Sequence, residues 1–312
     1  MLVEVYVAQL YIDNPWRDVS PPAEQRPDTQ HVEVYVAQRY IDNPYLIGGK
    51  KLYVLVTSYL PLRIWMYRSG FARFSNHRFT MQRGDISNAY VHLTNVAIQK
   101  TAPSYDKETG CKWDLRAMKL FMVSKHGMDP VNKCMADIQT LCIRSLQSVQ
   151  KTLGVQSLQS VQKVMMNDKH CFELYGYDVM IDDELKPWLI EYCFELYGYD
   201  VMIDDDELKP WLIEVNASPS LSSDTTADHE LKVGMLEDMT DIVDMEKKMT
   251  GREDQVGGFD LIFNNGPVRK ERPMGTQTLL GCYNNRVRNK QKLAQAHRVR
   301  ETHHGEAAAA KK

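Results

Sequence analysis

Three segments of this chain each occur twice, and this doubling limits the architectures open to it. Val3–Pro15 returns as Val32–Pro44, Ser145–Lys151 as Ser157–Lys163, and Cys171–Glu191 as Cys193–Glu214. A solenoid repeats one unit at one period, whereas here three unrelated segments are each doubled once. The sequence therefore predicts a globular fold interrupted by extra copies. We interpret the copies as recent duplications or as errors of gene assembly.

Composition excludes several classes of protein. The 312 residues are 43% apolar and 25% charged, which allows a sizeable core in about two domains and excludes wholesale disorder. A net charge of −3 excludes a generally basic nucleic-acid binder. No apolar run approaches the ~20 residues of a membrane span, and the first residues carry Glu4 without a basic stretch, so we expect no membrane partner and an intracellular location. The six cysteines form no C-x-x-C pair, which favours reduced thiols over a zinc site or disulfides.

Periodicity predicts both strands and helices. Strands are expected at Val32–Ala37, Leu52–Thr57 and Arg63–Tyr67, and short strands or loops at 70–75 and 90–99. Helices are expected at Asp114–Lys125, Pro130–Asp168 and Asp228–Met249, with loop-like chain from Thr250. The basic end, residues 286–312, is expected to be a solvated tail or a helix that touches an acidic surface.

The most informative stretch is an acidic hairpin pattern at residues 199–216. Two apolar strands flank an acidic turn, and alternation puts Glu214 and Asn216 on one face with Asp200 opposite or diagonal to them. Carboxylates so close repel unless a cation lies between them. Carboxylate and amide oxygens suit Mg²⁺ that holds nucleotide phosphates. The alternative is a solvated hairpin face with incidental acids.

These residues resemble a known family. The run Tyr197-Gly-Tyr-Asp200 followed by Leu208-Lys-Pro-Trp-Leu-Ile-Glu-Val-Asn-Ala-Ser-Pro-Ser-Leu221 is similar to the tubulin–tyrosine-ligase-like enzymes, which have an ATP-grasp fold. Other family motifs follow in order: Gln38–Lys51, Leu52–Ser58, Gly70–Phe74, His92–Asn95, Lys112-Trp113, Thr250–Arg252 and Gly257–Asp260. The motifs Thr250–Arg252 and Gly257–Asp260 resemble those of one polyglutamylase subgroup, the ninth of the ligase-like proteins. The resemblance covers roughly residues 32–285.

The resemblance implies an α+β, ATP-grasp-like fold and an ATP-dependent carboxylate–amine ligase. The implied reaction is polyglutamylation, in which ATP and Mg²⁺ activate a glutamate side chain of tubulin and the amino group of free glutamate then attacks. The implied site is as follows: Arg73 and Glu214 catalytic; Gln38, Arg39, Tyr40, Ile41 and Lys51 on ATP; Arg73, His92, Thr94 and Asn95 on the anionic substrates; Asp200, Glu214 and Asn216 on the metal. The implied location is the cytoplasm and cytoskeleton, at the basal body or axoneme of a cilium or flagellum.

The chain also departs from the family pattern. Phe-Asp-Leu-Arg is missing between Lys51 and Leu52, and the amino-terminal lobe is expected to be absent. The metal hairpin occurs in two copies, and the prediction assigns the site to the second. The expected division is a spare strand and loop at 1–31, a partial ligase domain at 32–249 and an extension with a basic tail at 250–312. The rival functions are a non-catalytic fragment that binds microtubules or axonemes, and a ligase for small molecules.

Overall fold

The structure forms two compact units, Met1–Asp42 and Asn43–Lys312. It is a computed structural model, and it describes residues 6–8, 37–39, 50–75, 77–85, 87–92, 96–105, 112–156, 172–181, 183–189, 219, 221–223, 225–268 and 275–309. In the first unit, β1 (Tyr6–Ala8) pairs antiparallel with β2 (Ala37–Arg39). These strands come from the two copies of one doubled segment, so the spare copy pairs with the expected adenine hinge.

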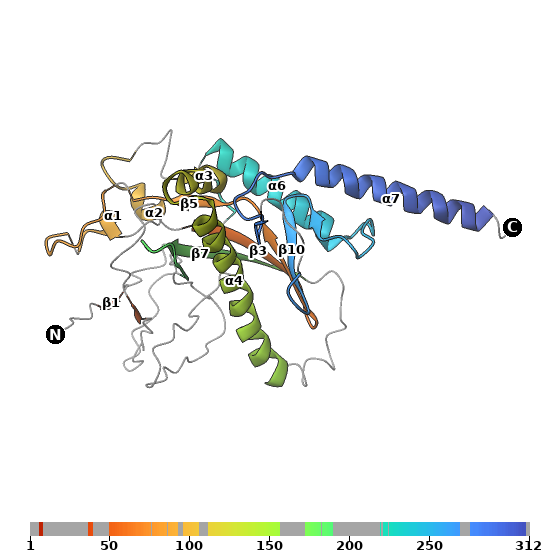
Figure 1. Cartoon of the computed structure of the whole chain (residues 1–312), viewed down its shortest axis with the longest axis horizontal. Coiled ribbons are helices and arrows are strands. Elements are labelled where there is room, and N and C mark those ends of the chain that lie inside the picture. The colour runs from red at the N-terminus through yellow and green to blue at the C-terminus, as the bar shows by residue number, and fades with distance from the viewer. Residues whose placement is uncertain are drawn as a thin grey trace, which may run out of the picture. The chain divides into compact units, whose positions relative to one another are not determined.

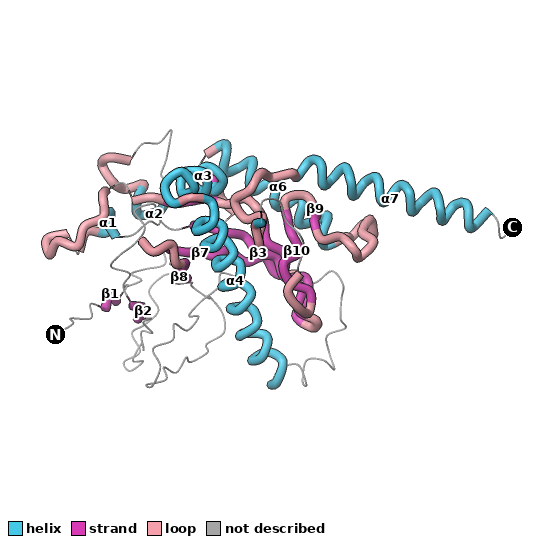
Figure 2. The backbone as a smooth tube through the Cα atoms, viewed as in Figure 1, coloured by secondary structure: helices cyan, strands magenta, loops and turns pink. Residues whose placement is uncertain are grey.

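The second unit is built on an antiparallel sheet of eight strands. The strands are β3 (Lys50–Tyr59), β4 (Leu62–Tyr67), β5 (Phe71–Arg73), β6 (Lys112–Asp114), β7 (Glu173–Ile181), β8 (Pro187–Leu189), β9 (Gln255–Val256) and β10 (Phe259–Asn264). Their order is β6-β5-β3-β4-β10-β9, with β7 on the other side of β3 and β8 beside β7. Strand β3 is therefore central, as Figures 1 and 2 show.

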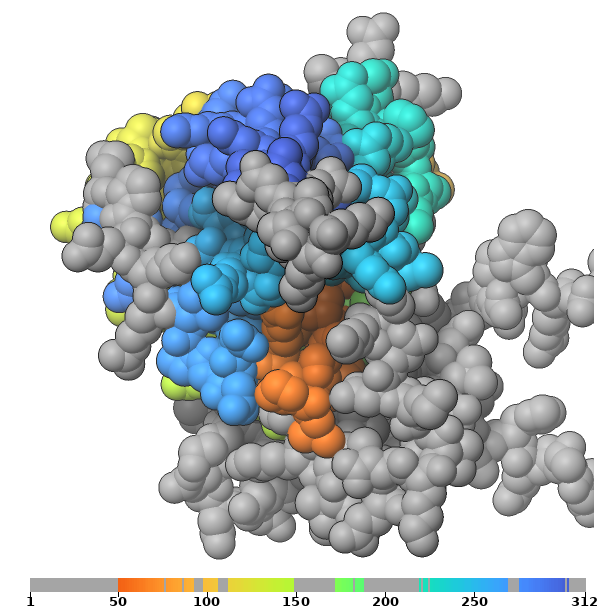
Figure 3. Space-filling view, turned by 90° about the vertical axis from the view of Figure 1, so that its right-hand side faces the viewer, coloured from red at the N-terminus to blue at the C-terminus, as the bar shows by residue number. Residues whose placement is uncertain are grey.

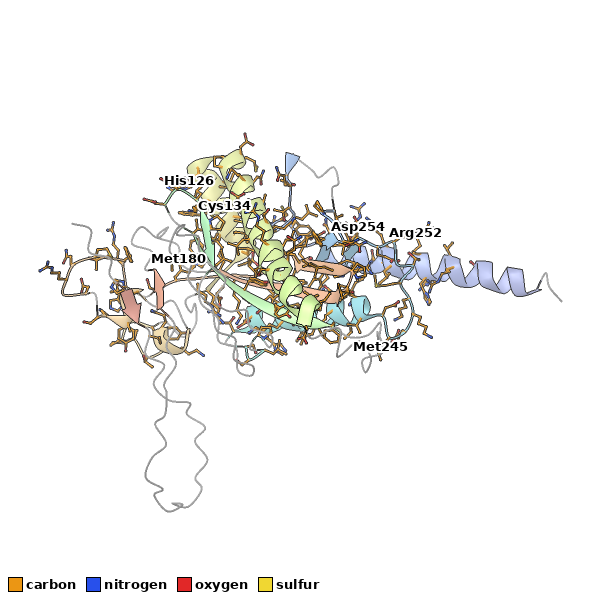
Figure 4. All side chains as sticks on the ribbon, turned by 90° about the horizontal axis from the view of Figure 1, so that it is seen from below. His126, Cys134, Met180, Met245, Arg252 and Asp254 are labelled. Atoms are coloured by element: carbon orange, nitrogen blue, oxygen red, sulfur yellow. The ribbon has the colours of Figure 1, made fainter. Side chains whose placement is uncertain are left out.

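Each face of this sheet is covered by helices. Alternate residues of β3 point to opposite faces. Leu52 and Val54 join the cluster formed with α3 (Leu115–His126) and α4 (Met128–Gln156), whereas Tyr53 and Leu55 join the cluster that includes α6 (Thr226–Val243). Figure 4 shows α3 and α6 on opposite sides of the strands. The α3–α4 face is an apolar core. The α6 face also carries the polar site.

Capping residues set the ends of helices α3 and α6. The Asp114 carboxylate accepts hydrogen bonds from the first turn of α3, and Gly127 ends that helix with a φ of 83°. Thr225 caps α6 by accepting from the backbone N–H of Asp228, and α6 ends at Val243, earlier than expected. The predicted helices at these places are confirmed. The expected long helix is present as α4, and residues 157–168 lie outside the described residues.

Two expectations about local structure are wrong. The segment 90–99, expected as short strands or loops, contributes to the short helices α1 (Ala89–His92) and α2 (Val96–Gln99). The chain after Thr250 is not loop-like throughout, because the apolar run of β10 pairs with β4 inside the sheet. The expected boundary at 249/250 thus falls between α6 and β9, which belong to one compact unit.

The basic end of the chain is helical. Helix α7 (Arg286–Ala309) begins with Arg286, whose guanidinium contacts Asp238 of α6 at 2.8 Å. In Figure 3 the dark blue surface of α7 adjoins the teal surface of α6. Leu293 joins the apolar cluster under α6, so this part of α7 is a packed helix and not a solvated tail. In the described part of the chain, no helix is both long and apolar enough to cross a membrane.

Candidate functional site

A polar site lies on the α6 face of the sheet, where four strands bring charged residues together. Lys51 of β3 is in register with Asp178 of β7 on one side and with Phe71 of β5 on the other. Arg73 of β5 is in register with Lys112 of β6. Residues in register share a face, and residues two apart on one strand do so too. Lys51, Arg73, Lys112 and Asp178 therefore share one face.

Asp178 lies between two cations. The Arg73 Nη1 atom is 3.5 Å from Asp178 Oδ1, and the two side chains are 18% and 20% exposed. Both groups are thus partly shielded but still reachable by a ligand. A guanidinium can bind a carboxylate or phosphate through two parallel hydrogen bonds. Arg73 and Asp178 together provide a site for an anion and for a cation.

A second carboxylate holds two lysines. Asp228, in the first turn of α6, is fully buried, and its oxygens lie 2.8 Å from the Nζ atoms of Lys112 and of Lys232. Burial alone would raise the pKa of Asp228, but the hydrogen bonds donated by both lysines outweigh it and lower that pKa. Lys112 also lies 5.6 Å from the centre of the Phe71 ring. Asp228 therefore anchors α6 to the edge strand β6.

Among the described residues of this face, positive charge exceeds negative charge. The four cations are Lys51, Arg73, Lys112 and Lys232, and the two carboxylates are Asp178 and Asp228. Burial lowers the pKa of Lys51 to about 8; Asp178 opposes this shift, and the three other cations add to it. An anion bound here would relieve that repulsion. The site is electrostatically suited to phosphates and carboxylates.

Two buried polar atoms on this face indicate where a ligand could bind. The Tyr53 hydroxyl and the Arg73 Nε atom have no hydrogen-bond partner among the described residues. Tyr53 is 0% exposed; burial raises the pKa of its hydroxyl, and the charge of Asp228 raises it further. Buried polar groups in proteins nearly always have partners. A polar ligand would supply them, so these atoms fit a nucleotide or an anionic substrate.

The chain that follows the second hairpin copy also reaches this face. A Cβ atom at Gly176 of β7 would be 2.8 Å from Pro219 Cβ and 3.5 Å from Lys51 Cε. Only glycine allows this approach. Pro219 is buried, and it follows Asn216 by three positions in the sequence. Pro219, the last residue of the Asn-Ala-Ser-Pro motif, thus packs against Gly176, and Lys51 lies close to the same glycine.

The structure brings together only some of the predicted site residues. Lys51 and Arg73 lie on the site face, whereas His92 is the last residue of the short helix α1, and its Nε2 atom is 2.9 Å from the Asp85 carbonyl oxygen. Gln38 and Arg39 belong to the first unit. The remaining predicted residues, Tyr40, Ile41, Thr94, Asn95, Asp200, Glu214 and Asn216, lie outside the described residues. Asp178, the corresponding aspartate of the first hairpin copy, is described, and it lies on the site face.

Sequence reasoning missed Asp228 and Lys232 and gave Lys112 no role. The Asp228–Lys232 spacing of four residues on a helix is a signal for an ion pair. Their third partner, Lys112, is far away in the sequence, and only the fold brings it close. Among the described residues, no group of three or more His, Cys, Asp or Glu side chains is placed to hold a metal. Of the two described carboxylates on this face, Asp178 is partly exposed and Asp228 is fully buried, so Asp178 is the better placed to offer the oxygen donor that Mg²⁺ takes alongside nucleotide phosphates.

Comparison with known proteins shows which family the sequence resembles. The profile of the tubulin-tyrosine ligase family matches residues 19–192 and 191–251. The probable tubulin polyglutamylase TTLL9 of Bos taurus is 49% identical over 297 residues, covering 91% of this chain and 50% of that protein. The corresponding Rattus norvegicus protein is 47% identical over 312 residues, covering 96% and 53%. The probable alpha-tubulin polyglutamylase Ttll1 of Tetrahymena thermophila is 38% identical over 282 residues, covering 86% and 53%.

The chain thus spans about half the length of these relatives. The family profile nevertheless includes all of α6 and the strands that carry Lys51, Arg73, Lys112 and Asp178. This chain belongs to the tubulin-tyrosine ligase family.

Proposed function

We propose that this protein is an ATP-dependent ligase that adds glutamate to glutamate side chains of tubulin. The observation that carries the proposal is the α6 face of the sheet, where four cations surround two carboxylates and two buried polar atoms have no described partner. Such a face suits substrates that are all anionic, as ATP, glutamate and a tubulin tail are. The relatives named above supply the substrate class, because their names describe tubulin polyglutamylases.

In this proposal Lys51 and Asp178 bind the nucleotide phosphates and their Mg²⁺. Lys51 faces Asp178 across the β3–β7 ladder, so an ammonium for phosphate oxygens and a carboxylate for the ion lie side by side. Mg²⁺ supplies charge neutralisation at the phosphates when bound. The set Asp200, Glu214 and Asn216 of the second hairpin copy stays a prediction, and Asp178 is the alternative that the described geometry supports.

The proposed reaction has two steps. The γ-phosphoryl group of ATP passes to a carboxylate of tubulin, and ADP leaves. The amino group of free glutamate then attacks the activated carbonyl carbon, so that an amide bond forms, the bond to phosphate breaks and a proton is released. Arg73 is suited to orient a carboxylate for this attack, and the cationic face stabilises charge that develops on phosphoryl oxygens. An ATP-grasp fold acting at cytoskeletal structures of a cilium or flagellum is part of the same proposal.

The experiment is incorporation of labelled glutamate into microtubules by the purified chain with MgATP. The proposal predicts label on tubulin that requires both ATP and Mg²⁺ and that is lost in Arg73→Met. A control variant, Arg78→Met, removes a cation from the exposed segment between β5 and α1 and should keep full activity. Microtubule co-sedimentation without nucleotide binding or label incorporation would contradict the proposal and favour a non-catalytic binding protein.

A further inference from the structure

Helix α3 has an outward side that the candidate site does not use. Its inward side chains Leu115, Met118 and Met122 are fully buried in the apolar core. Residues three or four positions apart lie on one side of a helix, which places Arg116 and Leu120 together on the outward side. Leu120 is 58% exposed, and Arg116 is exposed as well. In Figure 4, α3 lies on the opposite side of the strands from α6, so this surface is separate from the candidate site.

Aromatic rings extend this surface onto the neighbouring chain. Trp113 of β6 is in register with Ala72, a residue of the α3–α4 core, so its ring lies on the α3 side of the sheet. Trp113 is 46% exposed, and its ring centre is 5.0 Å from that of Phe74 and 6.0 Å from that of Phe121 in α3. Tyr283, which precedes α7, is 64% exposed. Single exposed apolar residues are normal, whereas rings that contact one another form a patch of the kind that marks an interaction site.

Cations lie on the same rings. The guanidinium carbon of Arg116 is 5.2 Å from the centre of the Tyr283 ring, and the ammonium nitrogen of Lys125 is 5.7 Å from the centre of the Phe121 ring. Among the described residues, neither cation forms an ion pair with a carboxylate. Helix α3 contains no aspartate or glutamate, and the Asp114 carboxylate that caps it already accepts hydrogen bonds from backbone N–H groups. This surface therefore combines aromatic rings with positive charge that no described carboxylate neutralises.

We propose that this surface docks an acidic peptide segment of another protein, and that an aromatic side chain of the segment packs on the exposed rings. The residues of this α3 patch are Trp113, Arg116, Leu120, Phe121, Lys125 and Tyr283. Charge complementarity selects an acidic partner, because a guanidinium can bind a carboxylate through its N–H groups while its flat face stays stacked on a ring. Aromatic residues and arginine are also the types enriched in protein interfaces. The inference goes beyond the proposed ligase function and does not depend on it.

The test is the affinity of the full chain for fluorescently labelled synthetic peptides, measured by polarisation. One peptide is rich in glutamate with a central tyrosine, a second has alanine in place of that tyrosine, and a third has lysine in place of the glutamates. We expect the tyrosine peptide to bind about fivefold or more tightly than the alanine peptide, because its ring adds contact with the patch. The lysine peptide should not bind, since like charges repel. Equal affinity for the first two peptides would overturn the inference, because it would show attraction of charge alone.

Two variants test the patch itself. Leu120→Ser removes an exposed apolar side chain without changing the charge, and Arg116→Glu reverses a charge. Each should weaken binding of the tyrosine peptide by about fivefold or more. Their matched controls are Val233→Ser, an exposed apolar residue of α6, and Arg252→Glu, an exposed arginine outside the patch, and both should bind the peptide as the wild type does. Equal effects of Arg116→Glu and Arg252→Glu would mean that net charge alone matters, which would overturn the inference.

Other binding modes give different results. Arg73→Met removes a cation of the candidate site and should leave peptide affinity unchanged. If Arg73→Met weakens binding and Leu120→Ser does not, the peptide binds on the α6 face and the inference is wrong. Sedimentation of the wild type without peptide tests a second copy as the occupant, and a dimer that Leu120→Ser abolishes would overturn the inference as well. Thermal melts show whether each variant folds, and the peptide series on the wild type decides independently of the variants.

Discussion

Lys51 and Asp178 face each other across the β3–β7 ladder, and Arg73 from a third strand approaches the same carboxylate at 3.5 Å. Two cations and one carboxylate from three strands thus share one face of the sheet. The opposite face is packed with apolar residues against α3 and α4. This difference between the faces explains why the candidate site lies on the side of α6.

The pH dependence of stability should reveal the cost of burying the charge of Lys50. This residue is fully buried, and its Nζ atom has no hydrogen-bond partner among the described residues. Burial lowers the pKa of Lys50 from 10.5 to about 7, and Cys134 of α4 is the group that opposes the shift. Between those values the unfolded chain binds more protons than the folded one, so stability rises with pH. Lys50→Leu should therefore raise the free energy of unfolding at pH 7 by about 4 kcal/mol.

That gain should shrink as the pH rises from 7 toward 10.5, because the wild-type amine is then neutral in the folded state. Denaturant titrations of wild type and Lys50→Leu at several pH values measure it. Lys133→Leu is the control, since Lys133 is exposed and should show little change. A gain independent of pH would show that packing, and not the charge, is responsible.

A pair of glycines tests the contact between α6 and the β9–β10 turn. Gly251 and Gly257 both have a positive φ, of 82° and 52°. Alanine there costs about 1–2 kcal/mol from backbone strain alone. A Cβ at Gly257 would also lie 2.1 Å from the Asp238 carboxylate carbon, whereas a Cβ at Gly251 meets nothing within 4 Å. Gly257→Ala should lower the melting temperature clearly more than Gly251→Ala, and equal effects would contradict this packing.

The ion pair between Arg68, the residue after β4, and Asp260 of β10 should couple these two strands. The guanidinium donates two hydrogen bonds to the carboxylate, at 2.6 and 2.8 Å, and both side chains are buried. Arg68→Met leaves a buried carboxylate without this partner and should cost about 3–5 kcal/mol. The double variant Arg68→Met, Asp260→Leu should cost less than the two single changes together. Additive costs, measured by denaturant unfolding, would mean that the two groups do not interact.

The sequence predicted elements whose causes are local. The apolar and β-branched run of β3 indicated its strand, and Asp114 and Gly127 marked the ends of α3. It did not predict β10, because a short apolar run after a loop becomes a strand only where β4 is available to pair with it. It also did not predict the Lys112–Asp228–Lys232 cluster, whose members come from β6 and α6.

The burial of Lys50 has a similar origin. In the family pattern Phe-Asp-Leu-Arg stands between the paired lysines and the leucine that is Leu52 here. Its absence places Lys50 two positions before Leu52, where the family pattern has the leucine of Phe-Asp-Leu-Arg. Strand alternation then directs Lys50 into the α3–α4 core and Lys51 onto the site face. The missing motif was visible in the sequence, but its consequence depends on the register of β3.

The most direct test of the site is the affinity of the purified chain for MgATP in two matched variants, Asp178→Asn and Asp200→Asn, which change the same residue in the two copies of the hairpin. The described geometry predicts that Asp178→Asn weakens MgATP binding by about tenfold or more, because the carboxylate beside Lys51 is lost, while Asp200→Asn leaves it near wild type. Weakening only by Asp200→Asn would instead assign the metal to the second copy. Wild-type affinity in both variants, or no MgATP binding by the wild type, would contradict a nucleotide site on this face.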